Sequence, residues 1–221
     1  MERIIEPELM EDLEQVEAYA AADFAEVHQQ RITWFTEIFG PTVECATILD
    51  VGCGPCDVTL RFARALPDSR IVAVDGSQVM LDAAARLLAA EPALAPRVHL
   101  LRAYLPEDSL PNESYGMVMS HSALHHFHDP AQFWDIVRTY APTGTIVFVS
   151  DLRRAASVEE AQQIVDQRAA NEPPALQRDF TASLCAAFTV EEVEAQLNAA
   201  GLGQLKVQAM GEIYLLVSGV V

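Results

Sequence analysis

The sequence is short of positive charge. Lysine and arginine together number 14 against 32 acidic residues, which gives a formal net charge of −18, and the only lysine is Lys206. Nucleic-acid binding depends largely on cations that displace phosphate counterions, and acidic membrane surfaces attract basic patches. The scarcity of cations therefore disfavours a nucleic acid or an acidic membrane as partner.

Long apolar runs and a cysteine framework are also missing. No apolar run approaches the roughly 18 residues that span a bilayer. The segment Met1–Pro7 lacks the basic flank and apolar stretch of a signal peptide. Four cysteines in a chain of 221 residues predict reduced thiols, not a disulfide scaffold. We therefore expect a cytoplasmic protein with no membrane insertion.

The apolar content is ample. Hydrophobic residues make up 51% of the 221 residues, which suits one α/β domain with a sizeable core. We predict a single domain over residues 1–221. Residues 1–44 would form a helical lid or extension, residues 45–150 the ligand-binding core, and residues 151–221 the substrate-side helices and a terminal hairpin.

Helical spacing of apolar residues predicts a helix from Pro7 to about Phe39 with an acidic outer face. Short apolar strands and helices alternate after residue 46. The predicted strands are 47–51, 71–74, 98–101, 115–119 and 145–149, and the helices are 58–66, 79–88 and 130–140. This alternation is typical of a doubly wound, mostly parallel sheet with helices on both faces.

The last third of the chain has a different pattern. Ser157–Glu160 and Thr189–Glu192 are capping-box sequences that open helices to about Ala170 and Gly201. A further helix is expected over 179–187, after the break at Pro173 and Pro174. The apolar runs 205–210 and 213–217 flank a glycine turn and predict an antiparallel pair. Together with the five earlier strands, this pair makes seven.

The strongest motif is a glycine turn between a strand and a helix. Residues 48–56 read Ile-Leu-Asp-Val-Gly-Cys-Gly-Pro-Cys, and the next strand, 71–75, ends at Asp75. Glycines in such a turn let the backbone approach a ligand closely. In dinucleotide-type folds an acid about 20 residues later binds ribose hydroxyls.

These residues resemble the first two motifs of class I S-adenosylmethionine-dependent methyltransferases. The resemblance covers roughly residues 45–150 and extends to Ser120–His126, Asp129-Pro130 and Pro142-Thr143-Gly144. The sequence is similar to the small-molecule branch of this family, which includes ubiquinone/menaquinone methyltransferases. It implies a Rossmann-like fold, S-adenosylmethionine as cofactor, and methyl transfer to a small-molecule acceptor. The acceptor and the O, N, C or S atom methylated stay open.

The resemblance also implies roles for individual residues. Gly52 and Gly54 would admit the methionine half of the cofactor, Asp50 would orient its amino group, and Asp75 would bind the ribose. The remaining cofactor contacts expected are Cys53, Gly76, Ser77, Met80, Tyr104, Leu105, Ser120 and His121.

Two positions depart from the family pattern. Cys56 stands where a third glycine is usual, so the following helix must begin slightly differently. Tyr104 stands near the position of an acid that often holds the adenine amino group. We therefore expect Tyr104 packing or backbone groups to hold the adenine.

Cys53-Gly54-Pro55-Cys56 also spells the active-site tetrapeptide of thioredoxins, where helix-start amides stabilise a thiolate. The chain is about twice as long as a thioredoxin domain, no tryptophan precedes Cys53, and Asp75 would have no role. A disulfide between Cys53 and Cys56 that distorts the turn remains an alternative.

Four histidines, His121, His125, His126 and His128, lie within eight residues. His121 and His125 have the i, i+4 spacing of a metal pair on a helix. We instead predict that no metal is bound and that His121 or His125 lies beside the cofactor. If the acceptor carries a proton at attack, a general base is needed. The candidates are His121, His125, Tyr19 and Asp151.

The acceptor pocket is expected from the N-terminal segment and residues 151–190. Aromatic side chains that could line it are Tyr19, Phe24, Trp34, Phe180 and Phe188. Arg153 and Arg154 could hold an anionic substrate group or could pair with surface acids. Two other function classes remain open: a protein that binds S-adenosylmethionine or S-adenosylhomocysteine without methyl transfer, and an NAD-dependent dehydrogenase.

Overall fold

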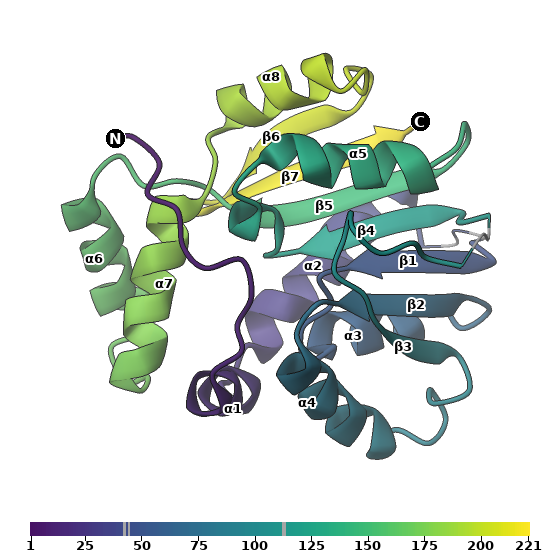
Figure 1. The fold of residues 1–221 in the computed structure, drawn as a ribbon, viewed down its shortest axis with the longest axis horizontal. Helices are drawn as coiled ribbons and strands as arrows, with labels where there is room; N and C mark the ends of the chain where they lie inside the picture. The colour runs from purple at the N-terminus through teal and green to yellow at the C-terminus, as the bar shows by residue number, and fades with distance from the viewer. Residues whose placement is uncertain (42, 44, 112–113) are drawn as a thin grey trace.

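The computed structural model describes residues 1–41, 43, 45–111 and 114–221. Its centre is a seven-stranded sheet of order β3-β2-β1-β4-β5-β7-β6 (Figure 1). The strands are β1 Thr47–Val51, β2 Arg70–Asp75, β3 Val98–Arg102, β4 Met117–His121, β5 Ile146–Leu152, β6 Lys206–Met210 and β7 Tyr214–Val220. Only the pairings of β7 with β5 and β6 are antiparallel. The predicted Rossmann-like sheet with a C-terminal hairpin is confirmed.

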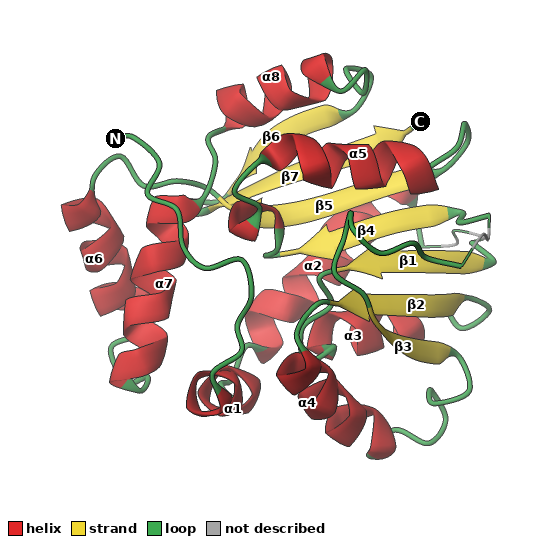
Figure 2. Cartoon of the chain, viewed as in Figure 1, coloured by secondary structure: helices red, strands yellow, loops and turns green. Residues whose placement is uncertain are grey.

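Helices cover both faces of the sheet (Figure 2). Strand residues alternate between two cores, as the period of a strand requires. Leu49 shares a core with Trp134 of α5 (Pro130–Tyr140) and with α8 (Val190–Ala199). Ile48 packs into the opposite core with α2 (Ala25–Phe39), α3 (Asp57–Ala65) and α4 (Gln78–Ala89).

The predicted N-terminal helix from Pro7 to Phe39 is wrong in its extent. Residues up to Asp12 contain no helix, and two helices follow, α1 (Leu13–Ala21) and α2. The Asp12 side chain accepts a hydrogen bond from the Gln15 amide, which caps α1. Asp23 accepts one from the Ala25 amide at the start of α2. Acceptors of this kind satisfy helix-start amides and so set new helix starts inside an otherwise helical pattern.

The C-terminal helices also differ in detail. Helix α6 spans Val158–Arg168, and α7 spans Pro174–Ala186, beginning earlier than expected because proline suits the first helical turn. The capping box at Thr189 forms as predicted. At Ser157 only one of the two capping-box hydrogen bonds forms, from the Glu160 amide to the Ser157 side chain. The Glu160 carboxylate accepts from the Ala156 amide instead of the Ser157 amide. No helix in the described chain is long and apolar enough to cross a bilayer.

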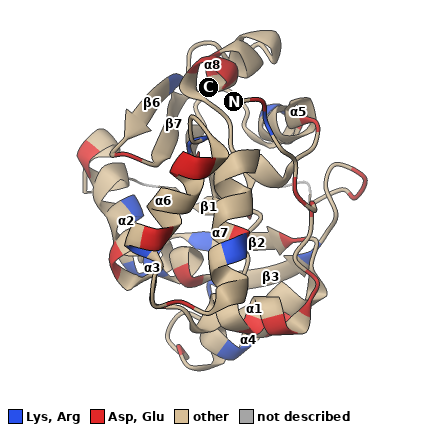
Figure 3. Ribbon diagram, turned by 90° about the vertical axis from the view of Figure 1, so that its left-hand side faces the viewer, with Lys and Arg blue, Asp and Glu red and all other residues tan. Residues whose placement is uncertain are grey.

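The helices α6 and α7 pack together beyond the end of the sheet, not on its faces (Figure 1). The opposite side of that end is closed by α1, and residues before α1 run between the two as an irregular segment. Acidic residues lie on α1, α6 and α8 around this end of the molecule (Figure 3). The carboxyl ends of β1, β2 and β4 face the space that these elements enclose.

Candidate active site

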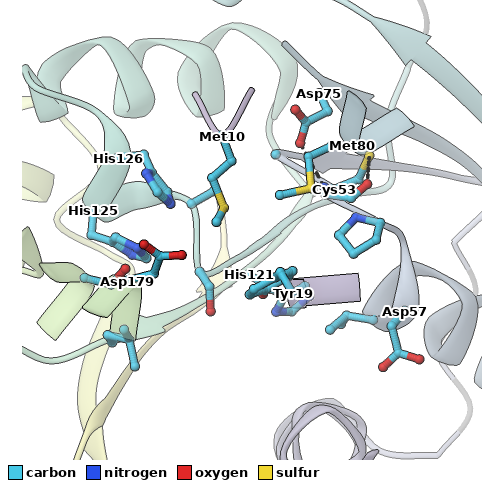
Figure 4. Close-up of a pocket in the computed structure, with 18 of the residues that line it drawn as sticks. Met10, Tyr19, Cys53, Asp57, Asp75, Met80, His121, His125, His126 and Asp179 are labelled. Carbon is cyan, nitrogen blue, oxygen red and sulfur yellow. Dashed lines mark hydrogen bonds between the residues drawn. The ribbon is translucent and has the colours of Figure 1, made fainter. Parts of the chain in front are cut away.

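A cavity of about 460 Å³ lies at the carboxyl ends of the parallel strands (Figure 4). We distinguish two sides of it. The glycine-turn side consists of residues 50–55, 74–76, 80, 103–105 and 121–123. The helical side consists of side chains from α1, α2, α7, β7 and the segments before them, including Tyr19, Phe24, Val27, Arg31, Leu176, Asp179, Phe180 and Tyr214.

The glycine turn after β1 needs its glycines. Gly52 has φ 71° and Gly54 has φ 52°, conformations that side chains disfavour. A Cβ on Gly52 would lie 2.6 Å from the Cβ of Ala123. The amides of Gly52 and Cys53 both donate to the Val74 carbonyl, which ties the turn to β2. The backbone here is therefore held open toward the cavity.

Cys56 stands where the methyltransferases that the sequence resembles usually have a third glycine. It adopts φ 68°, a left-handed conformation. This residue immediately precedes α3, and its side chain is fully buried. The conformation explains why glycine is usual there, and the small thiol fits in the core. A left-handed conformation at a residue other than glycine costs local strain on the order of 1–2 kcal/mol.

Asp75 links the turn to the next loop. Its carboxylate accepts hydrogen bonds of 2.8 Å from the Gly54 amide and from the Ser77 amide. Burial raises the pKa of Asp75, and these two bonds act in the opposite direction. Each carboxylate oxygen keeps a further lone pair, so the group can accept from a ligand diol while it holds the turn.

Asp50 lies on β1 and is buried. Its Oδ2 accepts a 2.6 Å hydrogen bond from the hydroxyl of Thr59, on α3. Burial raises the pKa of Asp50 to about 7, against the effect of the Thr59 bond. The sequence analysis did not identify Thr59 as a site residue. A polar residue on the buried side of α3 is a signal that could have indicated it.

The residues expected at the adenine end differ in whether they line the cavity. Gly76, Met80, Tyr104 and Leu105 line the cavity, and the Tyr104 hydroxyl donates to Glu8. Ser77 and Ser120, expected as cofactor contacts, do not line it. Ser77 accepts from the Met80 amide and donates to the Met10 carbonyl.

The Ser120 hydroxyl donates to the Val51 carbonyl inside the sheet. Its side chain is buried because alternate residues of a strand point to opposite faces. The prediction of a cofactor contact at Ser120 is therefore not supported by its position.

His121 ends β4 and lines the cavity. Its Nδ1 lies 2.9 Å from the Ser150 hydroxyl, and its ring stacks on Phe62. Nε2 is buried and has no hydrogen-bond partner among the described residues. Burial, and then the charge of Arg31, lower the pKa of His121 well below its usual value. The imidazole is therefore neutral at physiological pH.

His125 lies in a short 3-10 helix, η1 (Leu124–His126), so it does not share an α-helical face with His121. Its Nδ1 lies 2.5 Å from Asp151, and its Nε2 lies 3.2 Å from Glu6. Burial opposes a charge here, but the charge of Asp151 and the bonds to Asp151 and Glu6 raise the pKa of His125 to about 10. The ring is therefore an imidazolium between two carboxylates.

Glu6, His125 and His126 bring potential metal-ligating atoms within 4.8 Å of one another. In this structure the His125 ring lies between the carboxylates of Glu6 and Asp151, at 3.2 and 2.5 Å. The geometry of this group is that of an ion-pair network.

The other two candidate bases, Tyr19 and Asp151, differ in whether they reach the cavity. Tyr19 lines the cavity, and burial raises the pKa of its hydroxyl to about 12. Asp151 does not line it. Its carboxylate accepts from the His125 amide and from the Leu152 amide in addition to the His125 ring. Asp151 is therefore placed to orient His125, not to touch a ligand.

The structure separates the aromatic and cationic candidates into those that line the cavity and those that do not. Phe24 and Phe180 line the cavity, but Trp34 and Phe188 lie in the core. Arg153 and Arg154 lie away from the cavity, because Arg153 donates to the Glu212 carbonyl and Arg154 pairs with Glu192 at 2.6 Å. The arginine that lines the helical side beside the aromatic rings is Arg31, which sequence reasoning missed. Its signal was a cation within the apolar stripe of α2.

Residues 3–10, which we call the strap, cross the cavity between α7 and the loop after β2. Arg3 donates to the carbonyls of His125, Phe127, His128 and Ala186. Leu9 packs so closely that a Cβ on Gly76 would lie 2.9 Å from its Cδ2. The strap therefore joins the two sides of the cavity.

The Cys53 thiol of the Cys-Gly-Pro-Cys sequence lacks the lowered pKa of a reactive thiol. Cys56, together with burial, holds the pKa of Cys53 well above its usual value. Nucleophilic thiols require a lowered pKa. All four cysteines are free.

Comparison with known proteins agrees with this geometry. Residues 48–144 match the model of a methyltransferase domain family. An uncharacterised methyltransferase of Schizosaccharomyces pombe is 33% identical over 107 residues. That match covers 45% of this chain and 37% of the relative, so the chain corresponds to well under half of the relative's length.

Solved structures show the same fold. The plantazolicin methyltransferase BpumL, in complex with a triazolic desmethylPZN analog and SAH, aligns with a TM-score of 0.68 at 13% identity, covering 93% of this chain and 89% of that chain. A SAM-dependent methyltransferase from Aquifex aeolicus aligns at 0.67 and 15%, covering 95% and 98%. The fold of this chain is therefore that of class I S-adenosylmethionine-dependent methyltransferases.

Proposed function

We propose that this protein transfers a methyl group from S-adenosylmethionine to a small-molecule acceptor. The methyltransferase-domain match over residues 48–144 supports this reaction. The observation that carries it is the Asp75 carboxylate, which bonds the Gly54 and Ser77 amides at the edge of the cavity. A ribose diol fits the remaining acceptor positions of this carboxylate.

The residues present fit the cofactor at three points. Asp75 would hold the ribose, the open backbone at Gly52 and Gly54 would pass the methionine part, and Asp50 would orient its amino group. Met80 and Tyr104 would enclose the adenine, because both side chains line that end of the cavity. Bound S-adenosylmethionine supplies a sulfonium methyl group with a neutral leaving group.

The protein's own contribution is mainly to hold the acceptor in line and to exclude water. His121 Nε2 and the Tyr19 hydroxyl present polar atoms to the cavity, and they would position the acceptor atom. A neutral His121 can take up a proton only transiently, since its pKa is lowered. His125 already carries a proton, so it would act by fixing the strap and η1. Asp151 would orient the His125 ring.

Thermal unfolding in reductant with S-adenosylmethionine, S-adenosylhomocysteine and NAD, in turn, tests the cofactor. A ligand at 100 times its dissociation constant adds about 2.7 kcal/mol, which is several degrees for a chain of this size. We expect a shift with both sulfur compounds and none with NAD. A shift with NAD alone would favour a dehydrogenase instead.

An assay for S-adenosylhomocysteine production over an acceptor panel then separates transfer from mere binding. Its formation with any acceptor supports the enzyme. Cofactor binding without product across the panel would favour a binding protein.

Three finer assignments belong to the same proposal. The ubiquinone/menaquinone-type branch rests on the sequence motifs alone. A single domain over residues 1–221 and a cytoplasmic location follow from composition. The acceptor class is the subject of the next section.

A further inference from the structure

Arg31 is a buried cation in the cavity wall with no acid beside it. Its side chain is 2% exposed and lines the helical side. Within the described part of the chain its guanidinium forms no ion pair, and its Nη1 has no hydrogen-bond partner. Arg154, whose side chain is 8% exposed, is by contrast paired with Glu192 at 2.6 Å. A buried charge is costly unless it is paired, so the isolation of Arg31 requires an explanation.

The guanidinium is fixed in place by aromatic rings. Its central carbon lies 4.0 Å from the ring centre of Tyr214 and 4.7 Å from that of Trp34. Arginine stays protonated in proteins. Stacking on both rings therefore holds a positive charge in one orientation at the cavity wall, with one nitrogen unsatisfied.

Two acids of this region, Asp151 and Asp57, already have partners. Asp151, whose charge reaches Arg31, bonds the His125 ring. Asp57 bonds His28 at 2.6 Å and Arg61 at 2.9 Å. The cavity is also lined by Asp23, Glu172 and Asp179, and none of these forms an ion pair with Arg31.

A second unsatisfied polar atom faces the same region. His121 Nε2 is buried without a partner, and the charge of Arg31 contributes to the lowered pKa of His121. The hydroxyl of Tyr19 belongs to the same wall. Phe24, Val27 and Phe180 line the helical side with apolar surface. Of the cations that line the cavity, Arg168 is paired with Glu212 and His125 with Asp151 and Glu6. Arg31 therefore stands apart as the lining cation without an acidic partner in the described structure.

We propose that Arg31 binds an oxyanion of the methyl acceptor, either a carboxylate or an ionised phenolic oxygen on a small, largely apolar molecule. This inference rests on the proposed methyl transfer and names the acceptor class for it. A guanidinium forms two parallel hydrogen bonds with a carboxylate and strong charge-assisted bonds with a phenolate. A neutral acceptor would leave the buried charge unpaired and would bind more weakly.

The test measures binding of matched anionic and neutral probes by calorimetry at pH 8, with and without S-adenosylhomocysteine. The carboxylate pair is 4-nitrobenzoate and 4-nitrobenzamide, and the phenol pair is 4-nitrophenol and 4-nitroanisole. The variants are Arg31→Met, which keeps the stem, and Arg31→Lys, which keeps the charge. Arg138→Met is the control, because Arg138 is exposed on α5 and pairs with Asp135.

Wild type and the Arg138 control are expected to prefer the anionic member of at least one pair by about tenfold to a hundredfold. The pair that discriminates identifies the source of the oxyanion. Arg31→Met should lose this preference while its affinity for S-adenosylhomocysteine stays unchanged, and Arg31→Lys should keep part of it.

The inference is overturned if wild type lacks anion preference in both pairs, whether it binds all four probes equally or none. It is overturned equally if Arg31→Met prefers the anionic probes as strongly as wild type does, or more strongly. If Arg31→Met does not fold, the same result for Arg31→Lys overturns it. Failure of the proposed function has a different result: wild type binds no S-adenosylhomocysteine, while the probe comparison still decides the role of Arg31.

Discussion

The two sides of the cavity are built in different ways. The glycine-turn side comes mostly from one β1-α3-β2 unit and uses backbone amides and two carboxylates, Asp50 and Asp75. The helical side joins α1, α2, α7 and β7, which lie far apart in sequence, and uses side chains. The first side depends on local backbone geometry, and the second depends on how remote elements pack.

This contrast predicts that the two sides can be damaged separately. The largest effect is expected for Asp75→Ala on the glycine-turn side. Loss of the carboxylate removes the bonds to Gly54 and Ser77 and the proposed ribose contact, so S-adenosylmethionine should bind at least about 100-fold more weakly. Calorimetry measures this. Asp135→Ala, on the exposed face of α5, is the control, and equal affinity of wild type and Asp75→Ala would contradict the assignment.

The second prediction separates backbone strain from steric clash in the glycine turn. Gly52→Ala and Gly211→Ala both place alanine at positive φ, 71° and 59°, but only the first meets Ala123, at 2.6 Å. Gly211→Ala should cost about 1 kcal/mol from conformation alone. Gly52→Ala should cost about 2–3 kcal/mol more and impair cofactor binding.

Denaturant unfolding gives both values. Equal costs for the two glycine variants would mean that the turn relaxes freely, and that the close approach of Gly52 to Ala123 is not a constraint.

The third prediction concerns the ion-pair network that connects the two sides. The pKa of His125 is about 10 in the folded chain and about 6.5 when unfolded. Protonation therefore stabilises the fold fully below about pH 6.5, and this contribution is lost as pH rises toward 10. Wild type should lose stability over that window, on the order of 2 kcal/mol, more than His125→Gln does.

His99→Gln is the matched control, because His99 is exposed on β3. A pH dependence of His125→Gln that parallels wild type would show that another group titrates. If the proposed methyl transfer holds, His125→Ala is expected to lower turnover more than cofactor affinity, since His125 fixes the strap and not the glycine turn.

The smallest effect is expected for Arg3→Ala in the strap. Arg3 donates to four backbone carbonyls and lies 4.1 Å over the Phe188 ring. Its loss should weaken anchoring of the strap by about 1–2 kcal/mol and speed hydrogen exchange in residues 1–12. Exchange in β1 should not change. Unaltered exchange in the strap would mean that Glu6, Glu8 and Leu9 hold it without Arg3.

Sequence reasoning succeeded where a structural feature follows from neighbours in the chain. The turn at Gly52 and Gly54, the acid at Asp75 and the order of strands and helices could all be predicted, because a βαβ unit fixes its geometry within about 30 residues. Even the departure at Cys56 falls where glycine is expected, and its left-handed backbone explains the family preference.

The same reasoning was weakest where a side chain's role depends on a distant partner. The spacing of His121 and His125 indicated a shared helical face, but a strand end and a 3-10 helix separate them. Arg153 and Arg154 were considered for an anion, yet Arg31 occupies the cavity wall. Nothing local shows that Glu6 will meet His125, across about 120 residues.

The sequence by itself therefore determined the fold class and the glycine-turn side, because these depend on backbone conformation and strand periodicity. Tertiary structure alone decided the charge of His125, the neutrality of His121 and the isolation of Arg31. Those properties are set by burial and by the charges brought alongside, and both arise only when the strap, α2, α7 and β7 pack around the ends of the strands.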